Sequence, residues 1–224
     1  MVKLRIDIIS LFPGYFLGPF DESILKRAKE RGILDIRLID IRSFATDKHR
    51  LVDDRPYGGG PGMVMMAAPL VAAIRSVKTP SSLVVYLTPQ GEKLTASMGR
   101  EIAETTEHLI LVCGHYEGID ERVIALEIDR EISIGDFVLS NGALAAIVVT
   151  DVVARFVPGV IGHEEANRKD SFEEGIFDCP HYTRPEEFEG LTVPSVLLSG
   201  HHAEIEKWRK EQALKKTRRV RPDL

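Results

Sequence analysis

The sequence is poor in cysteine, and this scarcity excludes several classes of protein. Cys113 and Cys179 are the only cysteines among 224 residues. Two distant cysteines exclude a disulfide-stabilised scaffold, fit a reducing compartment and offer no zinc-binding spacing. No apolar run approaches the roughly 20 residues that a membrane-spanning helix needs. The amino-terminal stretch MVKLRIDIISLFPG has Arg5 and Asp7 inside its apolar part and lacks a small-residue cleavage site. We therefore expect a cytoplasmic protein whose side chains ligate no metal.

The sequence also lacks the GxGxxG fingerprint of dinucleotide-binding folds, because the first apolar segment runs into LFPGYF. Instead, short segments rich in Ile, Leu and Val alternate with helix-like segments along the first two thirds of the chain. This alternation indicates a parallel sheet whose faces are covered. We therefore predict an α/β fold with a mostly parallel sheet and helices on both faces. The expected strands are 4–10, 35–41, 82–87 and 108–114, and the expected helices are 94–107, 119–128 and 144–157.

The last third of the chain differs in composition. The stretch GVIGHEEANRKDSFEEG has few apolar residues and no periodicity. We interpret residues 161–175 as a linker between a first domain, 1–160, and a small, mainly helical domain, 176–224. The small domain contains a segment, 202–216, in which apolar residues recur at roughly helical spacing.

Positive charge concentrates at the end of the chain. Residues 201–224 contain eight Lys or Arg against four Asp or Glu, a balance of +4, whereas the whole chain carries −5. Residues 1–200 therefore carry −9. A solvated helix with an arginine-rich end accounts for this pattern, and a surface that contacts phosphates is the functional alternative.

Four loops stand out as candidate binding segments. Open α/β sheets bind ligands at the carboxyl ends of their strands, and there the sequence has the loops 86–92, 113–122 and 133–144. The fourth loop, VDDRPYGGGPGM (52–63), concentrates glycine. It neither follows a predicted strand nor opens a predicted helix, so a flexible hairpin and a phosphate-binding loop are equally compatible with it.

Five long motifs carry a resemblance to a known family. VDDRPYGGGPGM, YLTPQGEKL, LVCGHYEGIDERV, EISIGDFVLS and above all DSFEEGIFDCPHYTRP resemble, in order and over essentially the whole chain, the bacterial tRNA (guanine-N1)-methyltransferase family TrmD of the knotted SPOUT superfamily. The resemblance implies a homodimer with an active site shared between subunits, S-adenosylmethionine (SAM) as methyl donor, and methylation of guanosine at position 37 of tRNA, beside the anticodon. It also implies a trefoil knot in the backbone and a requirement for Mg²⁺.

The implied chemistry needs a base, because neutral guanine keeps a proton on N1. The resemblance assigns this role to Asp170. An unperturbed aspartate, with a pKa of about 3.9, is a weak base, so the charge that develops on guanine O6 must also be stabilised. The resemblance assigns that role to Arg155, whose guanidinium stays protonated. On spacing alone, Asp170 could instead begin a helix through the capping box of Ser171 and Glu174, and Arg155 could be a solvated charge at a helix end.

The cofactor pocket is expected in the three loops at the strand ends. Their glycines let the backbone approach a ligand, although plain turns would also explain them. The resemblance places Glu117 near the methionine end of SAM, and a surface acid in a turn is the alternative. Where the family commonly has GGELPA, this chain has NGALAA; Asn141 keeps access to positive φ, whereas Ala143 loses a carboxylate and Ala145 a rigid proline. The predicted SAM-binding residues are Tyr86, Leu87, Thr88, Pro89, Gly114, Tyr116, Glu117, Gly118, Ile134, Gly135, Asp136, Phe137, Val138, Leu139, Asn141, Gly142 and Ala145.

The RNA is expected to contact the glycine-rich loop, the DCPHYTRP motif and the basic tail. An arginine and a tyrosine in the loop suit a phosphate and a stacked base, and the target base must leave its stack to react. The tail would hold backbone phosphates. A related knotted methyltransferase with another target atom and a non-catalytic tRNA-binding protein remain alternatives. The predicted substrate-binding residues are Arg55, Tyr57, Gly58, Gly59, Asp178 and His181.

Overall fold

The computed structural model describes residues 2–162, 170–173 and 175–224. The chain forms two compact units, Met1–Gly162 and His163–Leu224, and each is considered by itself. Among the described residues, no helix combines the length and the apolar character that crossing a membrane requires.

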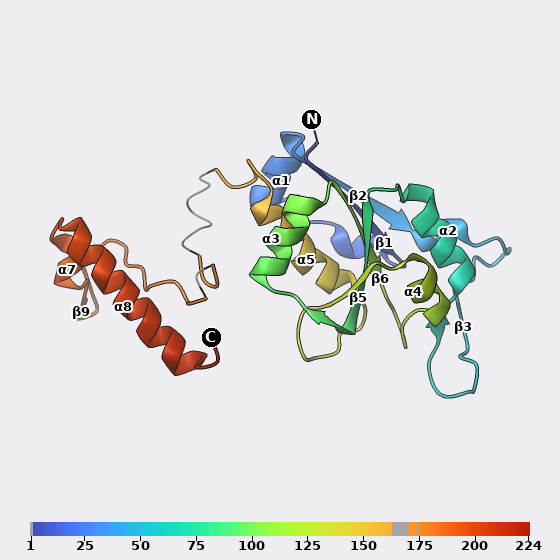
Figure 1. Cartoon of the computed structure of the whole chain (residues 1–224). Helices are drawn as coiled ribbons and strands as arrows, with labels where there is room; N and C mark the ends of the chain where they lie inside the picture. Colours follow the sequence, from blue (N-terminus) through green and yellow to red (C-terminus); the bar gives the residue numbers. More distant parts are fainter. Residues whose placement is uncertain (1, 163–169, 174) are drawn as a thin grey trace. The chain divides into compact units, whose positions relative to one another are not determined.

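The first unit is built on a five-stranded parallel sheet (Figure 1). The strands are β1 (Leu4–Ser10), β2 (Leu34–Asp40), β5 (Ser82–Lys93), β6 (His108–Cys113) and β7 (Arg130–Ser133), in the order β2-β1-β6-β5-β7. Every residue of β6 is buried, as expected for the middle strand of a sheet covered on both faces. The predicted parallel α/β sheet is confirmed.

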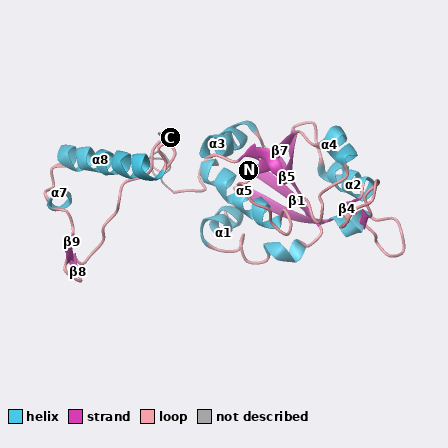
Figure 2. Cartoon of the chain, turned by 90° about the horizontal axis from the view of Figure 1, so that it is seen from below, coloured by secondary structure: helices cyan, strands magenta, loops and turns pink. Residues whose placement is uncertain are grey.

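Helices cover the two faces of this sheet (Figure 2). On one face α1 (Ser23–Glu30), α3 (Ala96–Thr105) and α5 (Ala143–Phe156) pack over one cluster of buried apolar side chains. On the other face α2 (Ala67–Val77) and α4 (Glu121–Glu127) pack over a second cluster. Two short 3₁₀ helices, η1 (Pro13–Phe16) and η2 (Ile41–Phe44), follow β1 and β2.

Two features of the first unit differ from the sequence predictions. Strand β7 was not predicted, because its four residues, REIS, include two charged side chains. The segment 86–92 was expected to be a loop, but β5 continues through it to Lys93 with a shift of register against β7 between Leu87 and Glu92. The glycine-rich loop agrees with the hairpin alternative, because it is the tip of an antiparallel hairpin formed by β3 (Asp53–Asp54) and β4 (Val64–Met65).

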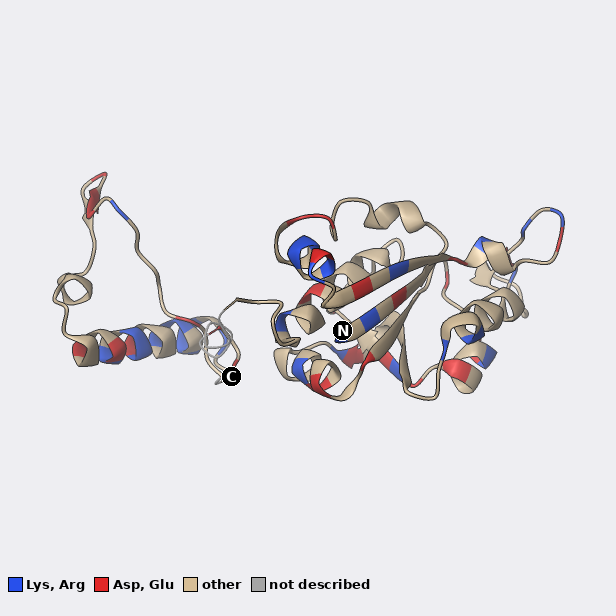
Figure 3. Cartoon of the chain, turned by 90° about the horizontal axis from the view of Figure 1, so that it is seen from above, with Lys and Arg blue, Asp and Glu red and all other residues tan. Residues whose placement is uncertain are grey.

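In its described residues, 170–173 and 175–224, the second unit contains a small hairpin and two helices. Strands β8 (Glu187–Phe188) and β9 (Leu191–Thr192) pair antiparallel, and α7 (Ser195–Leu198) precedes α8 (His202–Val220). The predicted helix thus begins at residue 202 and continues four residues beyond its expected end. Lys and Arg recur along α8, the long helix next to the carboxyl terminus (Figure 3). Its buried residues are Ile205, Ala213 and Thr217.

Most of the predicted linker, 161–175, lies outside the described residues, which resume at Asp170. The part that is described is joined to the second unit by hydrogen bonds. The Asp178 N–H donates to Ser171 Oγ over 2.9 Å, and the Phe177 N–H donates to Thr217 Oγ1 of α8 over 2.8 Å. The segment that follows Asp170 is therefore held against α8.

Candidate active site

A cavity of about 450 Å³ lies at the carboxyl edge of the sheet. Its walls come from the extended end of β5, the loop after β6, and the loop between β7 and α5. The sequence placed the ligand site at this edge, and all of the predicted SAM-binding residues except Asp136 line the cavity. The Asp136 side chain is 90% exposed and lies 3.3 Å from Lys93 Nζ. The lining that the sequence prediction missed is Gln90, His115, Ile119, Glu121, Ile124, Ile132, Ser133 and Ser140.

The loop after β6 and the start of α5 are joined by backbone contacts. The Gly142 N–H donates to the Gly114 carbonyl over 2.8 Å, and His115 forms an isolated antiparallel bridge with Asn141. A Cβ on Gly142 would lie 2.9 Å from Cys113 Cα, so this approach requires glycine. Asn141 does not adopt the positive φ that is accessible to it. Its Oδ1 instead accepts the Ala143 N–H over 2.8 Å and caps the first turn of α5.

Tyr86 forms one side of the cavity and is 6% exposed. A Cβ on Gly114 would lie 2.9 Å from the Tyr86 hydroxyl oxygen, and one on Gly118 would lie 3.2 Å from it. Burial raises the pKa of the Tyr86 hydroxyl, and a hydrogen bond with Thr88 opposes that shift. Gly114 and Gly118 therefore make room for the Tyr86 side chain, and this packing is a reason for glycine that is separate from ligand binding.

The charged residues of the cavity wall are acidic. Glu117 and Glu121 line it, and no Lys or Arg appears among the described residues that do. His115 is half-buried, and this burial lowers the pKa of its imidazole, with an opposing contribution from Asp53. Its Nδ1 accepts the Tyr116 N–H over 2.7 Å. The site therefore favours a ligand that carries positive charge.

Neither of the two predicted catalytic residues is among the residues that line this cavity. Arg155 is half-buried in the last turn of α5, ten residues after the lining residue Ala145, which is a distance of about 15 Å along the helix axis. Asp170 belongs to the second unit. Residues 171–173 form a turn, and Ser171 Oγ accepts an N–H from Asp178. The described residues 171–173 therefore do not begin a helix, and Glu174, on which the capping-box alternative depends, lies outside the described residues.

The predicted substrate residues fall into two groups. Arg55, Tyr57, Gly58 and Gly59 lie in the tip of the β3–β4 hairpin, where Tyr57 is fully exposed. Asp178 and His181 lie in the second unit, and His181 Nε2 is 2.8 Å from Asp178 Oδ2.

One group of potential metal ligands is present among the described residues. The ligand atoms of Asp178, Cys179 and His181 lie within 4.8 Å of one another. Burial, together with the Asp178 carboxylate, raises the pKa of the Cys179 thiol. Because the thiolate is the metal-binding form, this environment disfavours ligation by Cys179.

Comparison with known proteins identifies the family. The family model described as tRNA (Guanine-1)-methyltransferase TrmD matches residues 4–224. A tRNA (guanine-N(1)-)-methyltransferase of Protochlamydia amoebophila is 65% identical over 219 residues, which cover 98% of each chain. The protein of that name from Geobacter sulfurreducens is 56% identical over 223 residues and 91% of its length. The one from Chlamydia pneumoniae is 55% identical over 221 residues but only 61% of its length.

These matches span nearly the whole chain at high identity, and they confirm the resemblance that the five sequence motifs carry. The chain belongs to the TrmD family of tRNA (guanine-N1)-methyltransferases.

Proposed function

We propose that the chain transfers a methyl group from SAM to N1 of guanosine at position 37 of tRNA. The observation that carries this proposal, beside the family, is the cavity at the carboxyl edge of the sheet, whose charged lining consists of carboxylates. SAM has an ammonium and a sulfonium against one carboxylate, so its net charge complements this wall. When bound, SAM supplies an electrophilic methyl group on its sulfonium.

The protein's contribution to the chemistry is to remove a proton and to stabilise charge. Asp170 accepts the N1 proton of guanine, which frees a lone pair on that nitrogen for the methyl group. The negative charge then spreads to O6, where Arg155 donates hydrogen bonds. A fixed guanidinium lowers the proton affinity of the guanine, and this compensates for the weak basicity of an aspartate.

A homodimer is part of the proposal. Arg155 is about 15 Å along α5 from the cavity-lining Ala145, so one chain does not bring its own Arg155 to its own cavity. A second copy related by a two-fold axis would present the carboxyl end of its α5 to this cavity. We also propose the trefoil knot of the family. The contacts of Gly142 with Gly114 and of Asn141 with His115 support it.

The proposed RNA contacts are exposed side chains of the hairpin tip and of α8. The hairpin tip with Tyr57 would stack on a base near the target, and the cations of α8 would contact backbone phosphates. The family's Mg²⁺ requirement is retained in the proposal as a requirement of the reaction, without ligands from the protein's side chains.

The test is methyl transfer from isotope-labelled SAM to transcripts that differ only at position 37. A transcript with guanosine there should yield 1-methylguanosine on nuclease digestion and mass spectrometry, and one with adenosine should yield none. Label on a ribose or on another base would favour the related methyltransferase with a different target atom. Binding of tRNA without any transfer would favour the non-catalytic alternative. Chelation of Mg²⁺ should abolish transfer in the active reaction.

A further inference from the structure

The β3–β4 hairpin is joined to the turn that carries Glu117. The Glu117 N–H donates to the Met63 carbonyl over 3.1 Å, and the Met65 N–H donates to the Gly118 carbonyl over 3.0 Å. The Asp120 N–H then donates to the Met65 carbonyl over 3.0 Å. We call residues 62–65 the hairpin neck. Three backbone hydrogen bonds therefore link the neck to the cavity wall.

Gly62 lies directly against the Glu117 side chain. A Cβ built on Gly62 would be 2.6 Å from Glu117 Cγ and would also collide with Oε1. Gly62 has φ +87°, a conformation in which an alanine is strained. Gly60, in the same loop, has φ +114° and nothing within 4 Å of the equivalent Cβ position. Both glycines therefore have a positive φ, but only Gly62 has another side chain, that of Glu117, next to its Cβ position.

We propose that Gly62 is a positioning residue for Glu117. The hairpin neck thereby fixes the position of one of the two carboxylates that line the SAM cavity. The absence of a Cβ lets Glu117 lie along the neck while its backbone N–H is held by Met63. Glu117 is among the residues that line the cavity, and its carboxylate can accept a hydrogen bond from a cationic ligand bound there. This inference rests on the proposed function, since it takes SAM as the ligand.

The sequence did not indicate this role. Gly62 and Glu117 are 55 positions apart, and each has a sufficient local explanation as a turn residue. Only the packing of the hairpin on the turn after β6 brings them together. Through the same packing, the hairpin is joined by backbone hydrogen bonds to the turn that forms part of the cavity wall.

The experiment is calorimetric titration of SAM, without tRNA, into five proteins: the native chain, Gly60→Ala, Gly62→Ala, Glu117→Ala and the double variant Gly62→Ala/Glu117→Ala. A lost hydrogen bond to a charged group predicts that Gly62→Ala binds SAM about tenfold more weakly, or worse. Gly60→Ala, which carries the strain without the collision, should bind nearly as the native chain does. In the Glu117→Ala background, Gly62→Ala should cause no further loss, because the colliding side chain is gone.

Equal losses from Gly62→Ala in both backgrounds would overturn the inference, and so would equal losses from Gly60→Ala and Gly62→Ala. If Gly62→Ala alone does not fold, recovery of folding in the double variant supports the contact. Failure of the double variant to fold while Gly60→Ala folds contradicts it. Hydrogen exchange of the Glu117 amide, which should quicken in Gly62→Ala alone, gives a second reading without SAM. Failure of the native chain to bind SAM would instead count against the proposed function.

Discussion

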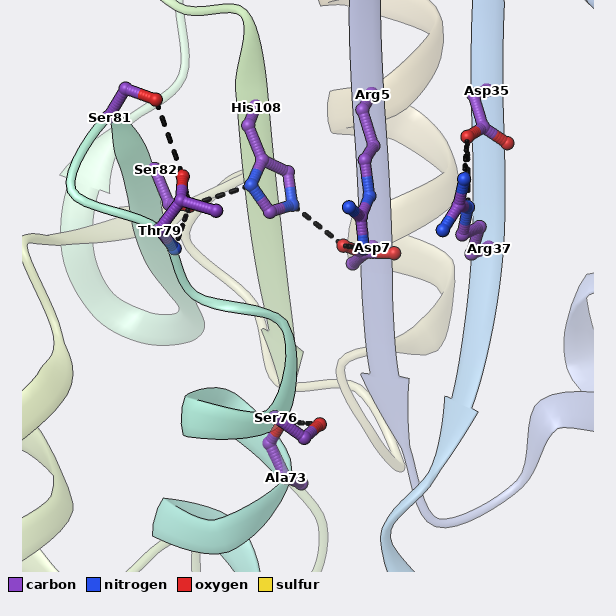
Figure 4. A network of polar contacts seen from close by, with 10 residues as sticks. All are labelled: Arg5, Asp7, Asp35, Arg37, Ala73, Ser76, Thr79, Ser81, Ser82 and His108. Atoms are coloured by element: carbon purple, nitrogen blue, oxygen red, sulfur yellow. Dashed lines mark hydrogen bonds and ion pairs between the residues drawn. The ribbon is translucent and has the colours of Figure 1, made fainter.

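His108 Nε2, at the start of β6, lies 2.6 Å from Asp7 Oδ2 in the middle of the neighbouring strand β1 (Figure 4). Asp7 is completely buried and His108 nearly so. The same carboxylate oxygen lies 2.7 Å from the Arg5 guanidinium, and His108 Nδ1 lies 2.7 Å from Ser82 Oγ. Because a carboxylate only accepts hydrogen bonds, a hydrogen bond between these atoms requires a proton on His108 Nε2. The network joins β1, β6 and β5 toward the amino-terminal ends of the strands, whereas the cavity lies at their carboxyl ends.

The first prediction concerns stability. Asp7→Ala should lower the free energy of unfolding by about 3 kcal/mol, because Arg5 and His108 lose their buried acceptor. Asp35→Ala on β2 removes the partner of Arg37, whose side chain is 55% exposed, and should cost less than about 1 kcal/mol. Urea unfolding at pH 7 measures both. Equal losses of unfolding free energy in the two variants would contradict the claim that burial makes the Asp7 contacts more stabilising than the exposed Asp35–Arg37 pair.

The second prediction concerns pH. Burial lowers the pKa of His115, with Asp53 opposing, so the imidazole stays neutral until the pH falls below the ordinary value of about 6.5. Protonation then places a positive charge beside a cavity that takes a cationic ligand. From pH 8 to about 6.5 His115 should therefore leave SAM affinity unchanged, and below that value its protonation should lower SAM affinity. Titration calorimetry across this range should show a weaker dependence for His115→Gln, and an unchanged dependence would rule out His115 as its source.

Much of the fold follows from local patterns. The segment HLILVC predicts a strand because it is a short, continuous apolar run, and the structure buries both of its faces. The helix predicted over 144–157 is displaced from α5 by one residue at each end. Strand β7 and the extension of β5 were missed, because they depend on pairing between residues 85–93 and 130–133 and not on their own composition. Tertiary pairing overrides weak local preference in such short strands.

The site was predictable in outline for a topological reason. Parallel strands bring their carboxyl ends to one edge, so three loops distant in sequence had to meet there. The contact of Gly62 with Glu117 and the capping role of Asn141 could not be predicted, since both arise from how separate loops pack. Asp170 remains a prediction from resemblance, because its position relative to the cavity depends on the seven residues, 163–169, that precede it and lie outside the described part of the chain.

The third prediction concerns the base. Asp170→Asn should bind SAM and tRNA as the native chain does, yet it should lose turnover by about a hundredfold or more, because an amide cannot accept the N1 proton. Glu187→Gln makes the same change of charge on exposed β8 of the same unit and should leave turnover nearly unchanged. Single-turnover methyl transfer at saturating SAM measures the chemical step. Near-normal turnover in Asp170→Asn would remove Asp170 from the mechanism.

The fourth prediction concerns subunit sharing. Because Arg155 lies about 15 Å along α5 from Ala145, the cavity of one chain and the Arg155 of the other should make each active site. Arg155→Ala and Gly142→Ala, the second of which disrupts the cavity wall, should each be inactive as pure proteins. Mixed after dissociation and reassociation, they should recover transfer, since heterodimers contain one intact composite site. A mixture that stays inactive, with heterodimers verified by native mass spectrometry, would contradict the shared site.

The fifth prediction concerns α8. Lys207, Lys215 and Arg218 are exposed, and helical periodicity puts them opposite the buried stripe of Ile205, Ala213 and Thr217. If this face contacts phosphates, the logarithm of tRNA affinity should fall linearly with the logarithm of salt concentration, and Lys215→Gln/Arg218→Gln should reduce the slope by about 2. Lys26→Gln/Arg27→Gln on α1 of the first unit removes the same charge from another exposed site. Fluorescence anisotropy over a salt series measures each slope, and equal changes for the two pairs would show that only net charge matters.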